Sequence, residues 1–207
     1  MAQFFEIHQT HPQKRLLAAV AQIIRDGGLV AYPTDSCYAI GCRLGEKAGV
    51  EHIRRIRQTG KDHNLTLMCR DLSEIAVYAR IENWAYRLLR ALTPGPYTFI
   101  LRATAEVPKR LQHPKRRSIG IRVPDHVIAQ GMLGELNEPL MSSTLMLPGD
   151  PLPMTDPAEI RDRLEHELEA VVDGGSCGIE PTTVLDLSEG EVLVRRQGRG
   201  DTSFLKI

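Results

Sequence analysis

The sequence of 207 residues predicts an α/β fold in which helices cover a sheet of mixed strand order. Segments with apolar residues at helical spacing alternate along the chain with short apolar runs of strand length. Glycine and proline mark the boundaries between these segments. Several short strands cluster in the middle of the chain, which favours a mixed rather than a purely parallel sheet. A chain of this length can bury a sizeable core without cross-links, so we expect one domain over residues 1–207.

The first half of the chain begins with a predicted helix over residues 12–25, which the glycine pair at 27–28 ends. A short apolar strand over 29–32 follows and stops at Pro33, which cannot donate a ladder hydrogen bond. The same patterns predict helices over 50–57, 72–78 and 83–92 and strands over 65–69 and 97–101.

The second half continues the alternation. Asp156 is a capping residue, Pro157 suits the first helical position, and Glu159 stands three residues past the cap. This pattern predicts a helix that starts there and runs to about Leu168. The other predicted elements are a helix over 127–136 and strands over 119–123, 140–143, 183–187 and 192–195.

Composition excludes several classes of protein. The formal net charge is zero, which argues against a general nucleic-acid-coating or membrane-surface protein. The first residues lack a basic leader, and no apolar run is long enough to span a bilayer, so we expect a cytoplasmic protein with no membrane partner. The four cysteines form no Cys-x-x-Cys pair, and the seven histidines show no ligand spacing. We therefore expect reduced, mostly buried thiols and no metal held by the protein.

Familiar catalytic signatures are absent from the sequence. It contains neither a P-loop nor a strand-linked Gly-x-Gly-x-x-Gly motif, which removes the common nucleotide-binding interpretations. It also lacks a Gly-x-Ser-x-Gly elbow, a His-Glu-x-x-His helix and the kinase motifs. A covalent hydrolase and a zinc protease are therefore not indicated.

Polar residues do follow several predicted strands, and open α/β sheets bind ligands beyond the carboxyl ends of their strands. These hydroxyl-rich groups are Thr34-Asp35-Ser36, Ser142-Ser143-Thr144 and Thr182-Thr183. The competing interpretation is that the hydroxyl groups only shape turns and caps.

Two arginines stand out for their positions. Arg122 puts a charge into the apolar strand predicted over 119–123, where it needs an anionic partner. That partner is either a ligand or an aspartate of the chain itself. Arg196 closes the last predicted strand, either as a phosphate clamp or as a surface arginine.

A basic segment around Pro114 forms a local positive face in an otherwise neutral protein. Such a face suits RNA or polyphosphate, although a solvated loop would look the same. It lacks the interleaved aromatics of a base-stacking platform, which weakens sequence-specific recognition. The residues of this face are Lys109, Arg110, Lys115, Arg116 and Arg117.

Four blocks of the sequence resemble the YrdC/YciO family and occur in the order found there. The opening block covers residues 27–42, and the later ones cover 94–101, 119–124 and 181–186. The spacing is most similar to YciO-type members. The resemblance implies a twisted open mixed sheet flanked by helices, with a concave, positively charged cavity.

The resemblance also implies an activity. The best-characterised branch makes threonylcarbamoyl-AMP and diphosphate from L-threonine, bicarbonate and ATP with Mg²⁺, as the first step of threonylcarbamoyl-adenosine formation in tRNA. By resemblance, Thr34 and Arg122 would bind threonine, and Arg57 and Arg122 would stabilise the reacting groups. The residues on the nucleotide side would be Arg57, Ser118, Ser142, Thr144, Thr182 and Arg196.

Two motifs depart from the family pattern. A Lys-x-Arg motif is replaced by Arg57-Gln58-Thr59, and a Ser-x-Asn motif by Ser142-Ser143-Thr144. The first hypothesis is therefore an enzyme acting on threonylcarbamoyl adenylate, by weakened synthesis or by breakdown. The alternative is a non-catalytic module that holds nucleotide or RNA, such as tRNA or double-stranded RNA, in the same cleft.

Overall fold

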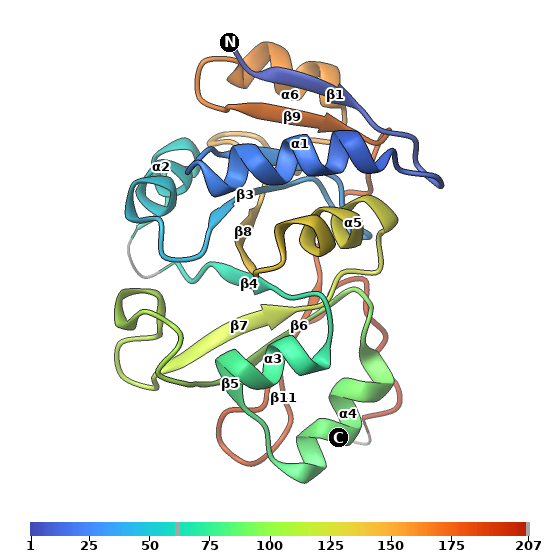
Figure 1. The fold of residues 1–207 in the computed structure, drawn as a ribbon. Coiled ribbons are helices and arrows are strands. Elements are labelled where there is room, and N and C mark those ends of the chain that lie inside the picture. Colours follow the sequence, from blue (N-terminus) through green and yellow to red (C-terminus); the bar gives the residue numbers. More distant parts are fainter. Residues whose placement is uncertain (61–62, 206–207) are drawn as a thin grey trace.

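The computed structural model describes residues 1–60 and 63–205 (Figure 1). Within this part of the chain, eleven strands join one mixed sheet, and six α-helices flank it, which confirms the predicted fold class. The helices are α1 (Lys14–Arg25), α2 (Lys47–Arg57), α3 (Leu72–Tyr78), α4 (Asn83–Leu92), α5 (Val127–Leu136) and α6 (Pro157–Leu164). The strands are β1 (Gln3–Glu6), β2 (Val30–Tyr32), β3 (Ala39–Arg43), β4 (Thr66–Met68), β5 (Ala79–Arg80), β6 (Tyr97–Ala103), β7 (Ser118–Arg122), β8 (Leu140–Thr144), β9 (Ala170–Asp173), β10 (Thr183–Asp186) and β11 (Leu193–Arg196).

The strand order of the sheet is β1-β9-β2-β3-β8-β4-β7-β6-β10-β11, with β5 paired to β6. Strand β9 runs parallel to both β1 and β2, and β4–β7 and β6–β10 are the other parallel pairs. The remaining pairs are antiparallel. The sheet is therefore mixed, and several of its neighbouring strands come from segments that lie far apart in the sequence.

The sequence predicts some elements better than others. Helices α3, α4 and α5 have the predicted bounds, whereas α6 ends at Leu164, four residues before the predicted end. Strands β1, β3, β5 and β9 are not predicted. Strand β3 contains Gly41 in its interior, and an interior glycine weakens the sequence pattern that predicts a strand. In the structure a Cβ atom there would lie 2.8 Å from Leu140 Cδ2, so the glycine permits the close approach of β8.

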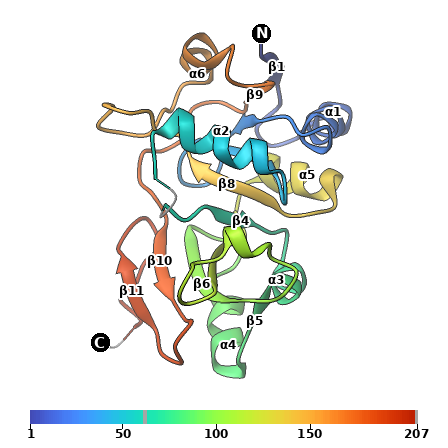
Figure 2. The same ribbon diagram turned by 90° about the vertical axis from the view of Figure 1, so that its left-hand side faces the viewer.

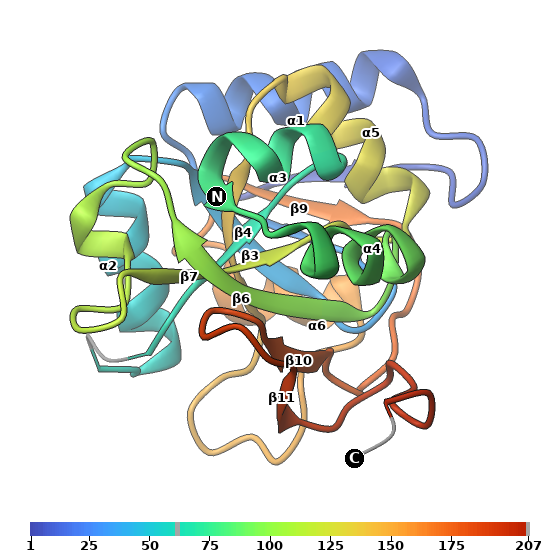
Figure 3. The same ribbon diagram turned by 90° about the horizontal axis from the view of Figure 1, so that it is seen from below.

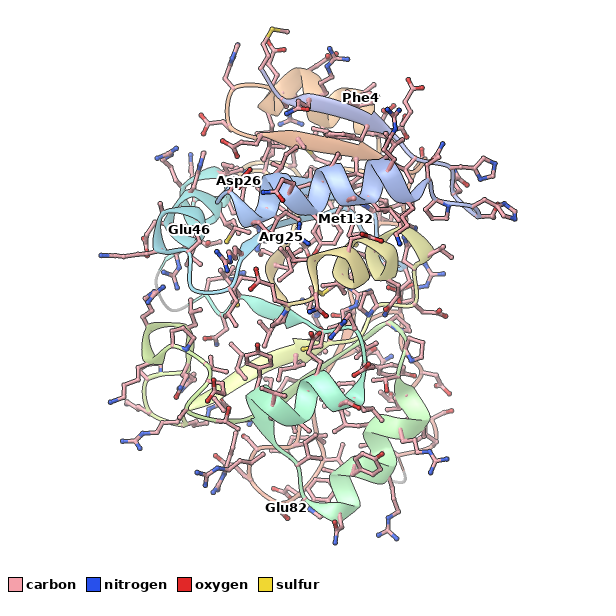
Figure 4. All side chains as sticks on the ribbon, in the orientation of Figure 1. Phe4, Arg25, Asp26, Glu46, Glu82 and Met132 are labelled. Carbon is pink, nitrogen blue, oxygen red and sulfur yellow. The ribbon has the colours of Figure 1, made fainter. Side chains whose placement is uncertain are left out.

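Helices pack on the sheet through two groups of buried side chains. Helices α1 and α5 lie against each other, and Arg25 near the end of α1 donates a hydrogen bond to the carbonyl of Glu135 on α5 (Figure 4). In the lower half, Phe99 of β6 and Ile121 of β7 belong to the same buried cluster as Leu89 of α4. The β10–β11 hairpin curls away from α3 and α4 (Figure 2).

The loop between β8 and α6 lies on the same side of the molecule as the β10–β11 hairpin when the protein is seen from below (Figure 3). These two segments therefore wall one side of the sheet without a covering helix. Within the described residues, none of the helices combines the length and the apolar character needed to cross a bilayer.

Helix α6 begins as the sequence predicts, with Pro157 in its first turn and Asp156 as its cap. The Oδ1 atom of Asp156 accepts hydrogen bonds from the backbone N–H groups of Ala158, at 2.8 Å, and Glu159, at 3.5 Å. These bonds fix the end of the loop that walls the open side of the sheet.

We expect Asp156→Ala to lower the free energy of unfolding by about 1 kcal/mol, because two N–H groups at the start of α6 lose their acceptor. Urea unfolding measures the change. Asp156→Asn should retain most of the stability, and Asp162→Ala, on the exposed face of the same helix, is the control. Equal losses from Asp156→Ala and Asp162→Ala would contradict the capping role.

Candidate functional site

A cavity of about 420 Å³ lies on the open side of the sheet. It is bordered by strands β3, β4, β6, β7, β8, β10 and β11, the end of α2, the loop after β2 and the segments before β4, α6 and β10. The cavity brings together all eight residues that were expected to bind threonine or nucleotide: Thr34, Arg57, Ser118, Arg122, Ser142, Thr144, Thr182 and Arg196. Thr59, the other position where the sequence departs from the family pattern, does not line it.

The floor of the cavity follows from the pleat of β7. Successive side chains of a strand point to opposite faces, so Ser118, Gly120 and Arg122 line the cavity while Ile119 and Ile121 are buried in the core. Gly120 keeps this floor open. A Cβ atom there would lie 3.4 Å from Thr98 Cγ2 and 3.6 Å from Thr66 Oγ1.

Arg122 is buried and has two partners from the loop after β2. Its Nη2 atom lies 2.5 Å from Asp35 Oδ1, and its Nη1 atom donates to Ser36 Oγ at 3.0 Å. The interpretation as an internal ion pair therefore holds, although Arg122 also lines the cavity. Arg122 Nε and Asp35 Oδ2 are buried without a hydrogen-bond partner in the described part of the chain. The pair thus keeps unused donor and acceptor capacity.

Arg57 and Arg196 reach the cavity from α2 and β11. Arg57 donates to Ser143 Oγ, and Arg196 donates to the carbonyl of Thr182 from Nε at 3.0 Å and from Nη2 at 2.9 Å. Neither forms an ion pair with a carboxylate among residues 1–60 and 63–205. Partial burial lowers the pKa of both guanidinium groups. An anion placed between them would therefore meet two positive charges that have no counter-charge.

The hydroxyl groups of the cavity wall have different roles. Thr34 Oγ1 donates to the Cys37 carbonyl at 2.7 Å and accepts from the N–H groups of Ser36 and Cys37, so its hydroxyl shapes the turn. Ser142 Oγ is held by the hydroxyl of Tyr32 at 2.7 Å. Burial raises the pKa of Tyr32, which keeps this phenol protonated. The Thr34 hydroxyl therefore shapes a turn, as the competing interpretation proposed, while the Tyr32 hydroxyl holds the Ser142 side chain in place.

The thiol groups offer no ready nucleophile. All four cysteines are free, and three are buried, as the sequence predicts. Burial raises the pKa of Cys37, which lines the cavity, and raises that of Cys177 to about 11. Both thiols are therefore protonated at neutral pH, and chemistry in this cavity would depend on alignment and charge.

The basic segment divides into two parts. Arg116 turns inward, lines the cavity and pairs with buried Asp186 at 2.9 Å. It therefore does not belong to the outward-facing surface that was expected to bind RNA. Arg110 donates to the carbonyl of Gly45. Arg110 nevertheless stays exposed and keeps its charge, while the exposed side chains of Lys109, Lys115 and Arg117 make no hydrogen bond or ion pair in the part of the chain that the structure describes.

The structure adds cavity residues that the sequence did not indicate. Thr66 and Thr98 lie beside Gly120, and the Thr98 and Thr182 hydroxyl groups are 2.8 Å apart. The sequence feature that could have indicated Thr66 and Thr98 is the alternation of polar and apolar residues, because each threonine directly precedes a core residue of its strand. Leu152 and Ile179 also line the cavity and are about half exposed, at 50% and 47%. They give it an apolar rim.

A second hollow of about 390 Å³ lies on the other side of Thr34 and is lined by residues that include Asp35, His126 and Arg199. It therefore shares with the first cavity the loop that carries Asp35. No group of three or more His, Cys, Asp or Glu side chains suited to a metal ion occurs in the described ranges.

Comparison with known proteins places this geometry in a family. The model for the Sua5, YciO and YrdC proteins, described as "Telomere recombination", matches residues 22–198. The chain belongs to this family. Over 201 residues it is 51% identical to the uncharacterized protein YciO of Escherichia coli K12, covering 97% of this chain and 98% of that protein. An uncharacterized protein of Haemophilus influenzae is 50% identical over 204 residues, covering 98% and 99%.

Solved structures agree with this membership. The crystal structure of E. coli YciO matches with a TM-score of 0.94 at 50% identity and covers 98% of each chain. The crystal structure of P. abyssi Sua5 complexed with L-threonine matches with a TM-score of 0.86 at 24% identity. That match covers 94% of this chain and 57% of the Sua5 chain, and it establishes the shared fold alone.

We expect Asp35→Asn to lower the free energy of unfolding by about 3–5 kcal/mol, because it leaves the buried Arg122 charge without its carboxylate. For the same reason, Arg122→Ala should destabilise the fold as well as alter ligand binding. Urea unfolding of both variants measures the loss.

The double change Asp35→Asn with Arg122→Met should cost less than the sum of the single changes, because neither buried charge is then left alone. Asp125→Asn, at an exposed neighbouring carboxylate, is the control. Additive losses in the double variant would show that the two side chains do not stabilise each other.

Proposed function

We propose that this chain is an enzyme that binds nucleotide and threonine and acts on threonylcarbamoyl adenylate. The observation that carries the proposal is the charge of the cavity. Four arginines line it, and two of them have no carboxylate partner among the residues that the structure describes, because only Arg122 and Arg116 form ion pairs, with Asp35 and Asp186. Such a lining favours a ligand with several negative charges, and arginine recognises phosphate and carboxylate groups through paired donors. The four arginines are Arg57, Arg116, Arg122 and Arg196.

The parts of a nucleotide match different parts of the cavity. The phosphates would lie near Arg57 and Arg196, which have no carboxylate partner in the described ranges. The base would contact the apolar rim of Leu152 and Ile179. The volume of about 420 Å³ lies in the usual range of small-molecule sites. The Sua5 relative that was solved with L-threonine supports an amino acid as the second ligand.

The chemistry needs no nucleophile from the protein. The threonine amine captures bicarbonate as a carbamate with loss of water, a carbamate oxygen attacks the α-phosphorus of ATP, and diphosphate leaves. Breakdown would instead use water to cleave the adenylate. In either direction the arginines would stabilise charge on the phosphoryl oxygens, and Mg²⁺ would arrive with ATP as part of the substrate.

The motif departures would affect turnover more than binding. Thr144 lines the cavity at the end of β8, where its short hydroxyl offers less reach than an amide. Thr59 carries no charge, so the second cation of the family motif is missing, and its side chain lies outside the cavity wall. The change at Thr144 removes a contact that would strengthen as diphosphate leaves, and such contacts raise the rate more than the affinity.

The decisive experiment incubates the purified protein with radiolabelled threonine, bicarbonate, ATP and Mg²⁺, and separately with preformed threonylcarbamoyl adenylate. Formation of the adenylate identifies a synthase, and accelerated loss of the adenylate identifies a breakdown activity. Binding of ATP without either conversion would contradict the enzymatic proposal and leave a binding module.

We expect Arg57→Ala to weaken ATP binding roughly 10- to 100-fold, because each charge-assisted hydrogen bond is worth about 1.5–3 kcal/mol. Isothermal titration calorimetry measures the affinity. Arg55→Ala is a matched control, since Arg55 lies on the same helix but is exposed and pairs with Glu167. If both variants bind ATP as the unaltered protein does, Arg57 does not contact the phosphates.

A second function, RNA binding, is favoured by the four exposed charges of the basic segment, of which Lys109, Lys115 and Arg117 make no side-chain hydrogen bond or ion pair among the described residues. Changing all three to alanine should flatten the slope of log affinity against log salt by roughly two to three units, if each contacts a phosphate. Filter binding to double-stranded RNA and to tRNA at several salt concentrations measures the slope.

The control for this experiment removes the same charge elsewhere, through alanine at Arg80, Arg87 and Arg90, which are exposed on β5 and α4. A slope that falls equally in both triple variants would indicate general charge attraction. A slope that changes in neither would assign the basic segment to a solvated loop.

A further inference from the structure

His63 lies at the mouth of the cavity and contacts the guanidinium group of Arg57. The distance between Arg57 Nη1 and His63 Nε2 is 2.7 Å. A guanidinium group has only donors, so Nε2 must be the acceptor in this contact. The imidazole ring is therefore neutral in this arrangement, with its proton on Nδ1.

Among residues 1–60 and 63–205, the charges that act most strongly on His63 are positive. Arg57 and Arg54 face it from α2, and Arg196 faces it from β11. Arg54 is paired with Glu51 at 2.8 Å, whereas Arg57 and Arg196 have no carboxylate partner in the described ranges. Partial burial and these three charges lower the pKa of His63. The ligand-free cavity thus keeps the ring neutral.

A polyphosphate anion would reverse this arrangement. When it accepts the donors of Arg57 and neutralises the field of Arg196, Nε2 of His63 loses both its donor and the positive charges that disfavour protonation. We propose that His63 is an additional ligand-binding residue, which takes up one proton at Nε2 as a nucleoside polyphosphate binds and then donates a hydrogen bond to it. The proton comes from solvent and returns to solvent when the anion leaves. This inference rests on the nucleotide site proposed above.

The pH dependence follows from the two states of His63. Its pKa lies below the usual 6.5 in the free protein, and the bound anion raises it. Between these two values, binding consumes a proton, so affinity rises as pH falls. Below the lower pKa the ring is protonated in both states, and affinity stops rising. Above the higher pKa the ring is neutral in both states, and its contribution is lost.

The test is calorimetric titration of ATP into the full chain at pH 7 in buffers with different ionisation enthalpies, which yields the number of protons taken up. We expect the unaltered protein to take up more protons than His63→Gln, by up to about one per ATP, because only one ring titrates. The proton uptake of ATP itself is common to both proteins and cancels in the difference. His63→Gln should also weaken ATP binding at pH 6 roughly tenfold, the value of a charge-assisted hydrogen bond.

His52→Gln is the matched control, because His52 lies on α2 and contacts Glu167 at 2.6 Å rather than the cavity. Its proton uptake should equal that of the unaltered protein. In addition, NMR titration of the ring resonances should show the pKa of His63 rising when ATP is added.

The outcomes separate the two proposals. Binding of ATP with equal proton uptake in the unaltered protein and His63→Gln, or an unchanged pKa of His63, would overturn this inference alone. Failure of the unaltered protein to bind ATP would overturn the nucleotide site and this inference with it. Loss of proton uptake in His63→Gln alone would establish the role of His63.

Discussion

The pleat of β7 places the hydrophobic core and the cavity on opposite faces of one strand. Because successive side chains alternate between faces, one strand supplies both the core, through Ile119 and Ile121, and the cavity, through Ser118, Gly120 and Arg122. A slip of one residue would exchange these roles and bury an arginine in the core. The pairings of β7 with β4 and β6 fix the register, so the packing of the core and the placement of the site are a single requirement.

The positive charges of the cavity are only partly balanced by carboxylates. Arg122 is neutralised by Asp35, whereas Arg57 and Arg196 are held by neutral oxygen atoms of Ser143 and Thr182. A hydrogen bond to a neutral oxygen orients a guanidinium group but does not cancel its charge. The arrangement therefore separates a structural arginine, which holds the loop after β2, from two arginines that are oriented and remain free to meet an anion.

The sequence predicted the bounds of three helices and the grouping of eight residues in one cavity better than it predicted the strands. Helices α3, α4 and α5 have the predicted bounds, while Gly41 obscures β3 and the predicted extension of α6 to Leu168 hides the approach to β9. Strands β1 and β5 contain only two and one apolar residues, so they lack the apolar run of a core strand. The family resemblance placed eight residues in one cavity, as the structure does. Thr66, Thr98 and His63 were missed because their proximity depends on the register between strands and on the end of α2. Whether Arg122 pairs within the chain also depends on a contact between distant segments, with Asp35.

The position of β9 between β1 and β2 has a consequence for synthesis on the ribosome. Strand β1 leaves the ribosome long before β9, its only partner in the described sheet, which follows more than 160 residues later. The cavity is likewise incomplete until β10 pairs with β6 and β11 brings Arg196 to the wall. Pairing between such distant segments is intrinsically slow. A nascent chain therefore has no complete cavity until β11 has emerged, so a molecule that binds there can stabilise only a chain that has folded through β11.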